Sequence, residues 1–191
     1  MSVFTKDFLW GAATASAQIE GAWNVDGRTP SIWDVAPAGK IKNNDTCHDS
    51  CDHYHHYKED VTLMKEMGLK SYRFSISWSR VIPEEGKVNP KGLQFYSDLV
   101  DELITNGIEP MVTIFHWDLP VWVYKKGGWL SEAIIPLFAE YTKVVVEALS
   151  DRVKYWITEN EPQCYIGAAL ASGEHAPGLK LGKKELFLAA H

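Results

Sequence analysis

The sequence has no long hydrophobic run, and no stretch approaches the roughly 20 apolar residues that a membrane-spanning helix needs. Its first residues, MSVFTKDFLWGAATA, lack a basic segment followed by an apolar run, so we expect no signal peptide. Cysteine is scarce, and Cys47, Cys51 and Cys164 are an odd number without the spacing of a disulfide framework. These absences favour a protein of the reducing cytoplasm.

The glycine signatures of nucleotide binding are also missing. No G-x-G-x-x-G follows a predicted strand, and no P-loop occurs. The net charge of −6 is spread over residues of both signs, which argues against nucleic acid and anionic membranes as partners. We therefore expect no cofactor, no nucleic acid and no membrane partner.

Aromatic residues, in contrast, are abundant. The 191 residues include eight Trp and eight Tyr, and 46% of the chain is hydrophobic, enough for the core of one domain. Flat aromatic rings often stack on the apolar faces of sugar rings, whereas a large aromatic core is the alternative explanation. Composition alone leaves both open.

Short apolar runs alternate with amphipathic helices, which is typical of parallel α/β architecture. We predict strands at residues 8–14, 71–77, 111–115 and 153–158, with a long loop over residues 18–50. Asp52 is a candidate cap for a helix whose apolar stripe holds Tyr54, Tyr57, Val61, Met64 and Met67, and Gly68 ends that helix.

Three further helices follow along the chain. Asn89 caps and Pro90 opens the first of them, since the fixed φ of proline suits a first helical turn. The next covers residues 136–149, and the last begins near Lys183.

Polar and aromatic side chains follow the predicted strands. Because the carboxyl ends of parallel barrel strands build one rim, these side chains should converge there. A rim of carboxylates, amides, imidazole and indoles suits a ligand with many hydroxyl groups and favours a barrel over a doubly wound sheet. The group consists of Gln18, Glu20, Arg73, Trp78, His116, Trp117, Asp118, Asn160 and Glu161.

Asn160-Glu161-Pro162 directly follows the fourth predicted strand. A carboxyl at such a position can serve as a general acid, and burial near another carboxylate would raise its pKa towards neutral pH. Arg73 points into the barrel interior, where an unpaired cation is costly, so it needs a carboxylate partner that this part of the chain does not obviously supply. A polar strand end with a turn proline is the plainer alternative for Glu161.

A second cluster invites a metal interpretation. Cys47, His48, Cys51, His53, His55 and His56 lie close together, but no second ligand pair at zinc-finger spacing follows them. We therefore predict no metal site.

Four blocks resemble, in order and from about Phe4 to the last residue, glycoside hydrolase family 1, the family of β-glucosidases and β-galactosidases. The blocks are FLWGAATASAQIEGAW, DHYHHYKEDVTLMKEMGLKSYRFSISWSRVIP, GIEPMVTIFHWDLP and YWITENEPQC. The resemblance implies that residues 1–191 are the N-terminal half of a (β/α)8 TIM barrel, a partial glycosidase domain ending in its fourth helix. It also implies a retaining enzyme that hydrolyses β-glucosides or related β-glycosides.

The resemblance further implies a role for each matching residue. Glu161 would be the acid/base, while Gln18, His116, Trp117 and Asn160 would bind the glycone, the sugar whose bond is cleaved. Arg73 would pair with a nucleophilic glutamate, which in this family lies on a later strand. HWDLP and NEP are similar to the branch that uses unphosphorylated sugars.

Two residues depart from the family pattern. Ala17 stands where the family often has Tyr, and Glu159 stands where it usually has an apolar residue. Strand alternation predicts Glu159 and Glu161 on the same side, with Arg73 a possible partner of Glu159.

A binding module is the alternative to an enzyme. Such a module would be a catalytically inactive half-barrel that binds sugar or associates with itself through its exposed barrel edges.

Overall fold

The computed structural model describes residues 3–37, 39 and 41–191. Its four strands form one parallel sheet in the order β1-β2-β3-β4, so neighbours in the sequence are neighbours in space. This confirms the predicted half of a parallel barrel. The strands are β1 (Gly11–Ala13), β2 (Ser71–Ser75), β3 (Glu109–Phe115) and β4 (Tyr155–Glu159).

A helix or several helices follow the carboxyl end of each strand, and the longer ones connect one strand to the next. They are α1 (Ser16–Ile19), α2 (His53–Glu66), α3 (Trp78–Val81), α4 (Pro90–Thr105), α5 (Val121–Tyr124), α6 (Ile134–Leu149), α7 (Pro162–Cys164) and α8 (Lys183–Ala190), with 3-10 turns at Lys42–Asn44 and Gly128–Leu130 and a π-helix at Tyr165–Ala171.

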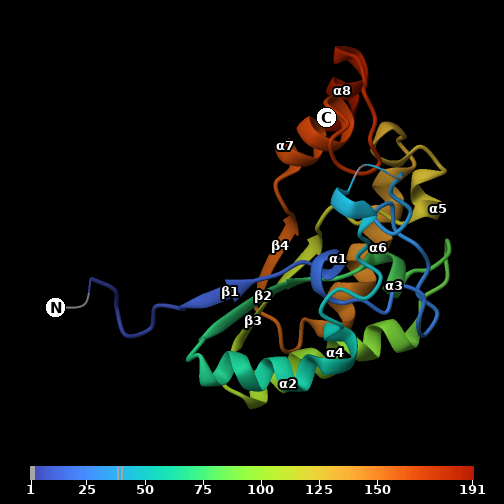
Figure 1. Ribbon diagram of the computed structural model, residues 1–191. Helices are drawn as coiled ribbons and strands as arrows, with labels where there is room; N and C mark the ends of the chain where they lie inside the picture. Colours follow the sequence, from blue (N-terminus) through green and yellow to red (C-terminus); the bar gives the residue numbers. More distant parts are fainter. Residues whose placement is uncertain (1–2, 38, 40) are drawn as a thin grey trace.

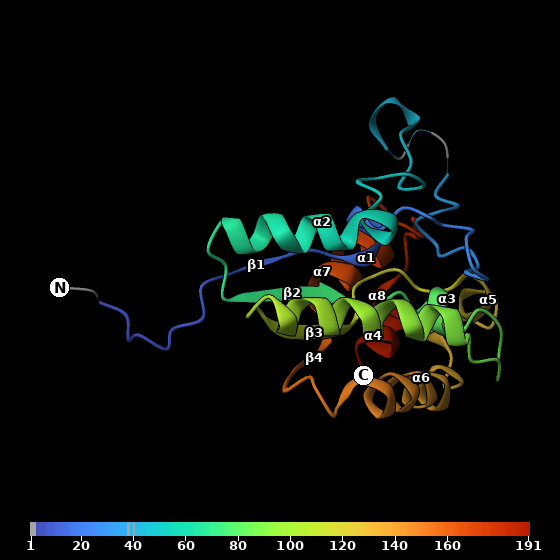
Figure 2. The same cartoon turned by 90° about the horizontal axis from the view of Figure 1, so that it is seen from below.

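The three long helices lie along one face of the sheet. Figures 1 and 2 show α2, α4 and α6 side by side on that face, while no helix of the described residues lies across the opposite one. The core fills the space between helices and sheet and includes Tyr72, Phe74, Val112 and Ile114. The uncovered face is the one that would line the barrel interior.

The N-terminus of α4 has the cap and the first residue that the sequence predicts. The side chain of Asn89 accepts a hydrogen bond from the backbone N–H of Lys91 at 3.2 Å, and Pro90 is the first helical residue. The helix ends before Gly107, whose φ of +73° favours glycine. One face of α4 is buried and contributes Tyr96, Leu99 and other residues to the core.

The start of α2 differs from our prediction. Asp52 has a left-handed backbone (φ 53°) and makes no capping hydrogen bond. Its carboxylate instead lies 2.6 Å from Nδ1 of His55. Met67, which we placed on the buried stripe, is 75% exposed, because it lies beyond the last helical residue.

All four strands differ from their predicted ranges at one end or both, β3 because it begins at Glu109 and β4 because it spans Tyr155–Glu159. The first strand is shorter than 8–14, and Phe8, Leu9 and Trp10 before it are exposed. The second strand stops at Ser75, because the backbone N–H of Ser77 donates to the hydroxyl of Tyr96 and the chain turns into α3. The predicted loop at 18–50 begins within α1.

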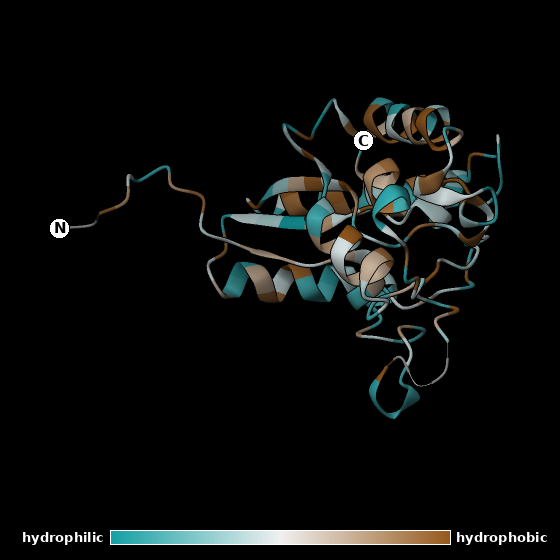
Figure 3. Cartoon of the chain, turned by 90° about the horizontal axis from the view of Figure 1, so that it is seen from above, coloured by the Kyte–Doolittle hydropathy of each residue, from teal (hydrophilic) through white to brown (hydrophobic). Residues whose placement is uncertain are grey.

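The distribution of hydrophilic and hydrophobic residues agrees with this architecture. In Figure 3 the α2 ribbon alternates hydrophilic and hydrophobic segments, as expected of a helix with one face in solvent. In the described part of the chain, no helix is both long and apolar enough to cross a membrane.

Candidate active site

The carboxyl ends of the strands carry most of the predicted site. Figure 1 shows α1 beyond the end of β1 and α7 beyond the end of β4. The segment after β3 begins at His116. Because the strands are parallel, residues that follow them meet at one edge of the sheet, the edge at which barrel enzymes build their sites.

Arg73 and Asn160 are joined across the sheet. Arg73 donates from Nη2 to Oδ1 of Asn160 at 2.7 Å and from Nε to the hydroxyl of Thr113 at 2.8 Å. Among the described residues Arg73 has no carboxylate partner in an ion pair. The predicted partnership with Glu159 is therefore not formed, and an amide and a hydroxyl satisfy the guanidinium instead. Thr113 was missed, although a lone polar residue within the run MVTIF was a usable signal.

His116 follows β3 and is neutral at physiological pH. Partial burial and the charge of Arg73 lower its pKa to about 4, against an opposing effect of Glu161. Its Nδ1 is buried and has no hydrogen-bond partner among the described residues. A neutral imidazole has one donor and one acceptor nitrogen, so it can take either role towards a sugar hydroxyl.

Trp117 has a left-handed backbone, with φ 71°. Its indole N–H donates to the backbone carbonyl of Asn160 at 2.7 Å, so this donor is used inside the protein. The bond joins the segments that follow β3 and β4. Its ring lies 5.3 Å from that of His116 and 5.4 Å from that of His175.

Glu161 directly follows Asn160, and its side chain is exposed. It has a left-handed backbone (φ 45°) and precedes Pro162, the first residue of α7. Its backbone carbonyl accepts a hydrogen bond from the backbone N–H of Cys164 at 2.9 Å. Burial and a hydrogen bond to the Glu161 side chain both raise the pKa of the Cys164 thiol. This contact was not foreseen from the sequence.

Glu159 does not share the surroundings of Glu161. It lines a groove of about 470 Å³ together with Trp129, Ile135, Tyr165 and residues of α8. Burial raises the pKa of this carboxyl. The predicted alternation fails because Glu161 lies beyond the strand and leaves the extended conformation.

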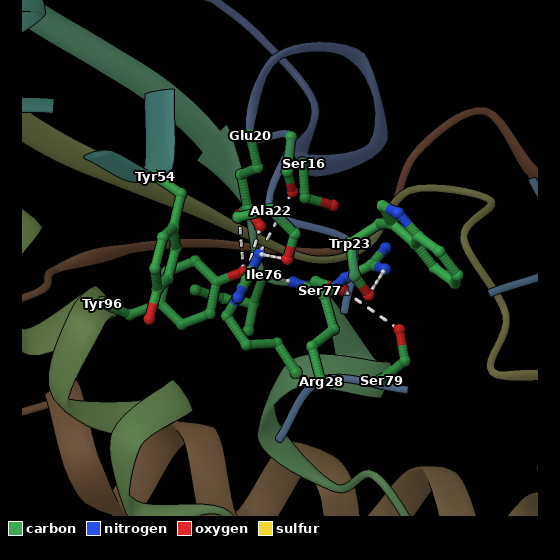
Figure 4. A network of polar contacts seen from close by, with 12 residues as sticks. Ser16, Glu20, Ala22, Trp23, Arg28, Tyr54, Ile76, Ser77, Ser79 and Tyr96 are labelled. Atoms are coloured by element: carbon green, nitrogen blue, oxygen red, sulfur yellow. Dashed lines mark hydrogen bonds and ion pairs between the residues drawn. The ribbon is translucent and has the colours of Figure 1, made fainter. Parts of the chain in front are cut away.

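Four residues that we placed on the rim are buried in the structure, Asn160 and three others. Trp78 is fully buried and stacks on Tyr141 of α6 at 4.7 Å. Glu20 accepts from Nε of Arg80 at 3.1 Å and from the hydroxyl of Tyr96 at 2.6 Å (Figure 4). The third is Asp118, which accepts from the hydroxyl of Ser16 at 2.7 Å. These three side chains serve the packing behind the rim, because each has its contacts inside the fold.

Gln18 is the remaining residue that we predicted to bind the sugar. It lies within α1, and its side chain is exposed beyond the end of β1. Its backbone N–H donates to the carbonyl of Ala15 at 2.9 Å, while its side-chain amide makes no hydrogen bond to the described residues. The amide is thus available to a ligand.

The cysteines and histidines considered as metal ligands make other contacts in the structure. The three cysteines are free, and His53 pairs with Asp60 at 2.6 Å. The part of the chain that the structure describes contains no group of three or more His, Cys, Asp or Glu side chains arranged to hold a metal ion.

A parallel half-barrel that carries a carboxylate, an amide and a neutral imidazole at its strand ends belongs to the TIM-barrel class. The family model for Glycosyl hydrolase family 1 matches residues 1–191, and the chain belongs to that family.

Curated relatives agree with this assignment. The chain is 47% identical over 194 residues to a 1,4-beta-D-glucan glucohydrolase of Thermotoga neapolitana, covering all of this chain and 45% of the relative. It is 50% identical over 180 residues to Beta-glucosidase A of Acetivibrio thermocellus (93% and 40% covered). An aryl-phospho-beta-D-glucosidase of Bacillus subtilis is 47% identical over 192 residues (98% and 40% covered).

A solved structure matches the fold closely. The beta-glucosidase from Thermotoga maritima in complex with castanospermine superposes with a TM-score of 0.96 at 48% identity, covering 98% of this chain and 43% of that one. The chain thus spans less than half the length of the relatives that it matches. It corresponds to the N-terminal half of their barrel.

Proposed function

We propose that this chain supplies the acid/base and part of the glycone site of a retaining β-glycosidase that acts on β-glucosides. The observation that carries the proposal is the placement of Glu161. It lies at the end of β4 beside Asn160, whose side chain Arg73 fixes and whose backbone carbonyl accepts from Trp117.

The acid/base role follows from chemistry at the strand ends. In the first step Glu161 would protonate the glycosidic oxygen as the bond to the sugar breaks, and in the second it would take a proton from water. The second carboxylate must lie about 5 to 5.5 Å away to act as a nucleophile. The strands that complete the barrel would supply it.

The neighbouring side chains suit a polyhydroxylated ligand. The exposed amide of Gln18 and the partly exposed imidazole of His116 offer donors and acceptors to sugar hydroxyls. Asn160 retains amide hydrogens while its carbonyl is held by Arg73.

Completion of the barrel tests the proposal. Residues 1–191 would be joined to the C-terminal part of the Thermotoga maritima beta-glucosidase, which is 48% identical over the matched region, to give a protein called here the completed barrel. We expect it to hydrolyse aryl β-glucosides with retention of configuration, detected by NMR of the first sugar product. A folded completed barrel that neither binds nor hydrolyses β-glucosides contradicts the proposal.

The same protein tests the choice of sugar. Both a beta-glucosidase and an aryl-phospho-beta-D-glucosidase are about equally similar to this chain. The HWDLP and NEP segments favour unphosphorylated glucosides, so kcat/KM should be higher for an aryl β-glucoside than for its 6-phosphate. Preference for the phosphorylated sugar would overturn this part.

A further inference from the structure

The short helix α1 carries Gln18 and is held from both ends by buried polar groups. At its first residue, Ser16 donates from its hydroxyl to Oδ2 of Asp118 at 2.7 Å, and its backbone N–H donates to the hydroxyl of Ser75 at 2.8 Å. Just past its last residue, Glu20 accepts from Arg80 and Tyr96. The four residues of α1 are too few to form a stable helix by themselves, so these contacts must hold it in place.

Asp118 connects α1 to the other side of the site. It is fully buried and lies two residues after His116, so the Ser16–Asp118 bond ties the helix that carries Gln18 to the segment that carries His116. The second oxygen of Asp118 has no hydrogen-bond partner among the described residues. Burial of a carboxyl with only part of its bonding capacity satisfied is costly, and active sites often tolerate such costs.

We propose that Ser16 and Asp118 are positioning residues that set Gln18 relative to His116, so that both reach the same sugar. This inference rests on the proposed function for its ligand, a glucose-like ring. Neither residue touches the sugar: Ser16 is 5% exposed and Asp118 fully buried. Their effect on binding passes through Gln18.

The structural part of the inference can be tested on the 191-residue chain itself. In α1 the backbone N–H of Glu20 donates to the carbonyl of Ser16 at 3.0 Å, so its hydrogen exchange reports opening of the helix. We expect Ser16→Ala and Asp118→Ala each to accelerate exchange of this amide about tenfold, because a buried polar group that loses its hydrogen-bond partner costs about 1 to 3 kcal/mol. Asp118→Asn keeps an acceptor oxygen and should restore most of the protection.

Ser31→Ala is the matched control. Ser31 is also buried and also donates to an aspartate, Asp34, at 2.8 Å, but it lies outside α1. This variant should leave exchange at Glu20 unchanged. Unchanged exchange in Ser16→Ala, or equal acceleration in Ser31→Ala, would overturn the inference whatever the protein's activity.

The functional part uses a double-mutant cycle in the completed barrel, with deoxynojirimycin, an imino sugar, as the probe. Ser16→Ala should weaken its inhibition constant about tenfold when Gln18 is present, and about twofold or less in a Gln18→Ala background. The loss should appear in KM rather than in kcat. Equal losses in both backgrounds would show that Ser16 acts on the fold as a whole and would overturn the inference.

The two proposals fail in different ways. If the unmutated completed barrel folds but neither binds deoxynojirimycin nor turns over glucosides, the proposed function fails. If it binds and the cycle shows no coupling between Ser16 and Gln18, the positioning role fails alone. The exchange measurement on the 191-residue chain decides the structural part in either case.

Discussion

Arg73 of β2 reaches across β3 to donate to the side chain of Asn160, at the end of β4, over 2.7 Å. On the way its Nε donates to Thr113 of β3 at 2.8 Å. One guanidinium thus connects three strands on the face of the sheet that has no helix. It also fixes the orientation of the residue next to Glu161.

This contact predicts different effects for two substitutions of Asn160. Asn160→Ala should lower the free energy of unfolding of the 191-residue chain by about 1 to 2 kcal/mol, because Arg73 loses an acceptor in a partly buried place. Asn160→Asp should cost less or stabilise the chain, because a carboxylate accepts from Arg73 with opposite charge. Urea denaturation measures both. A more stable Asn160→Ala would contradict the role of this bond.

The acid/base role predicts a dependence on the leaving group. In the completed barrel, Glu161→Gln should slow hydrolysis of alkyl or disaccharide β-glucosides at least about 100-fold, because general acid catalysis contributes about 10²- to 10⁴-fold. Activated aryl glucosides need little protonation and should lose much less in their first step. Azide should then accelerate the second step. Equal losses on both substrate types, without an azide effect, would remove Glu161 from this role.

In the proposed function the nucleophile lies on the strands that complete the barrel, and this predicts the behaviour of residues 1–191 alone. This polypeptide should hydrolyse aryl β-glucosides at no more than the background rate, because Glu161 can protonate a leaving group but cannot also form the glycosyl-enzyme. The assay needs rigorous purification and the Glu161→Gln variant as its control. Turnover that survives purification and disappears in that variant would show that another carboxylate, Glu159 being the nearest in sequence, acts as the nucleophile.

The shifted pKa of Asp118 predicts that the free energy of unfolding depends on pH. Burial raises its pKa from 3.8 to about 7, against the hydrogen bond from Ser16. Between these values the unfolded chain ionises at this residue while the folded chain stays protonated. The contribution of Asp118 to the free energy of unfolding therefore falls as pH rises through this window.

Asp118→Asn removes that dependence. The stability of this variant relative to the wild type should increase from pH 4 to pH 7 by on the order of 3 kcal/mol and level off above, as measured by urea denaturation at each pH. Ser31→Ala, which removes no titratable group, should differ from the wild type by a constant amount. A constant difference for Asp118→Asn as well would show that Asp118 is ionised throughout the window.

The open sheet predicts association of the 191-residue chain with itself. Val112 and Ile114 of β3 are buried against the helices, so substitutions there would test only the core. The edge strands β1 and β4 remain unpaired on their outer sides in the described chain, and such edges recruit other strands. Light scattering at micromolar concentration should show a dimer or larger species.

A lysine at the edge should weaken this association. Thr158→Lys places a charge on an exposed position of β4, whereas Thr105→Lys places it on an exposed position at the end of α4 and serves as the control. Only the former should shift the equilibrium towards monomer. A monodisperse wild-type monomer with a cooperative melting transition would contradict self-association.

The sequence by itself determined the order of strands and helices and several helix ends. The spacing of apolar positions and the start of α4 at Asn89-Pro90 can be predicted locally. Both depend on residues that lie only a few positions apart in the sequence. The motifs likewise predicted that His116 and Glu161 follow the carboxyl ends of β3 and β4, and in the structure both residues do.

Only the tertiary structure decided which polar residues remain available to a ligand. Glu20 and Asp118 look like rim residues in the sequence, but partners 60 and 102 residues away withdraw them into the core. Glu159 and Glu161 have different surroundings because the backbone turns between them, which strand alternation alone does not predict. Long-range hydrogen bonds and burial set these outcomes, and no local pattern contains them.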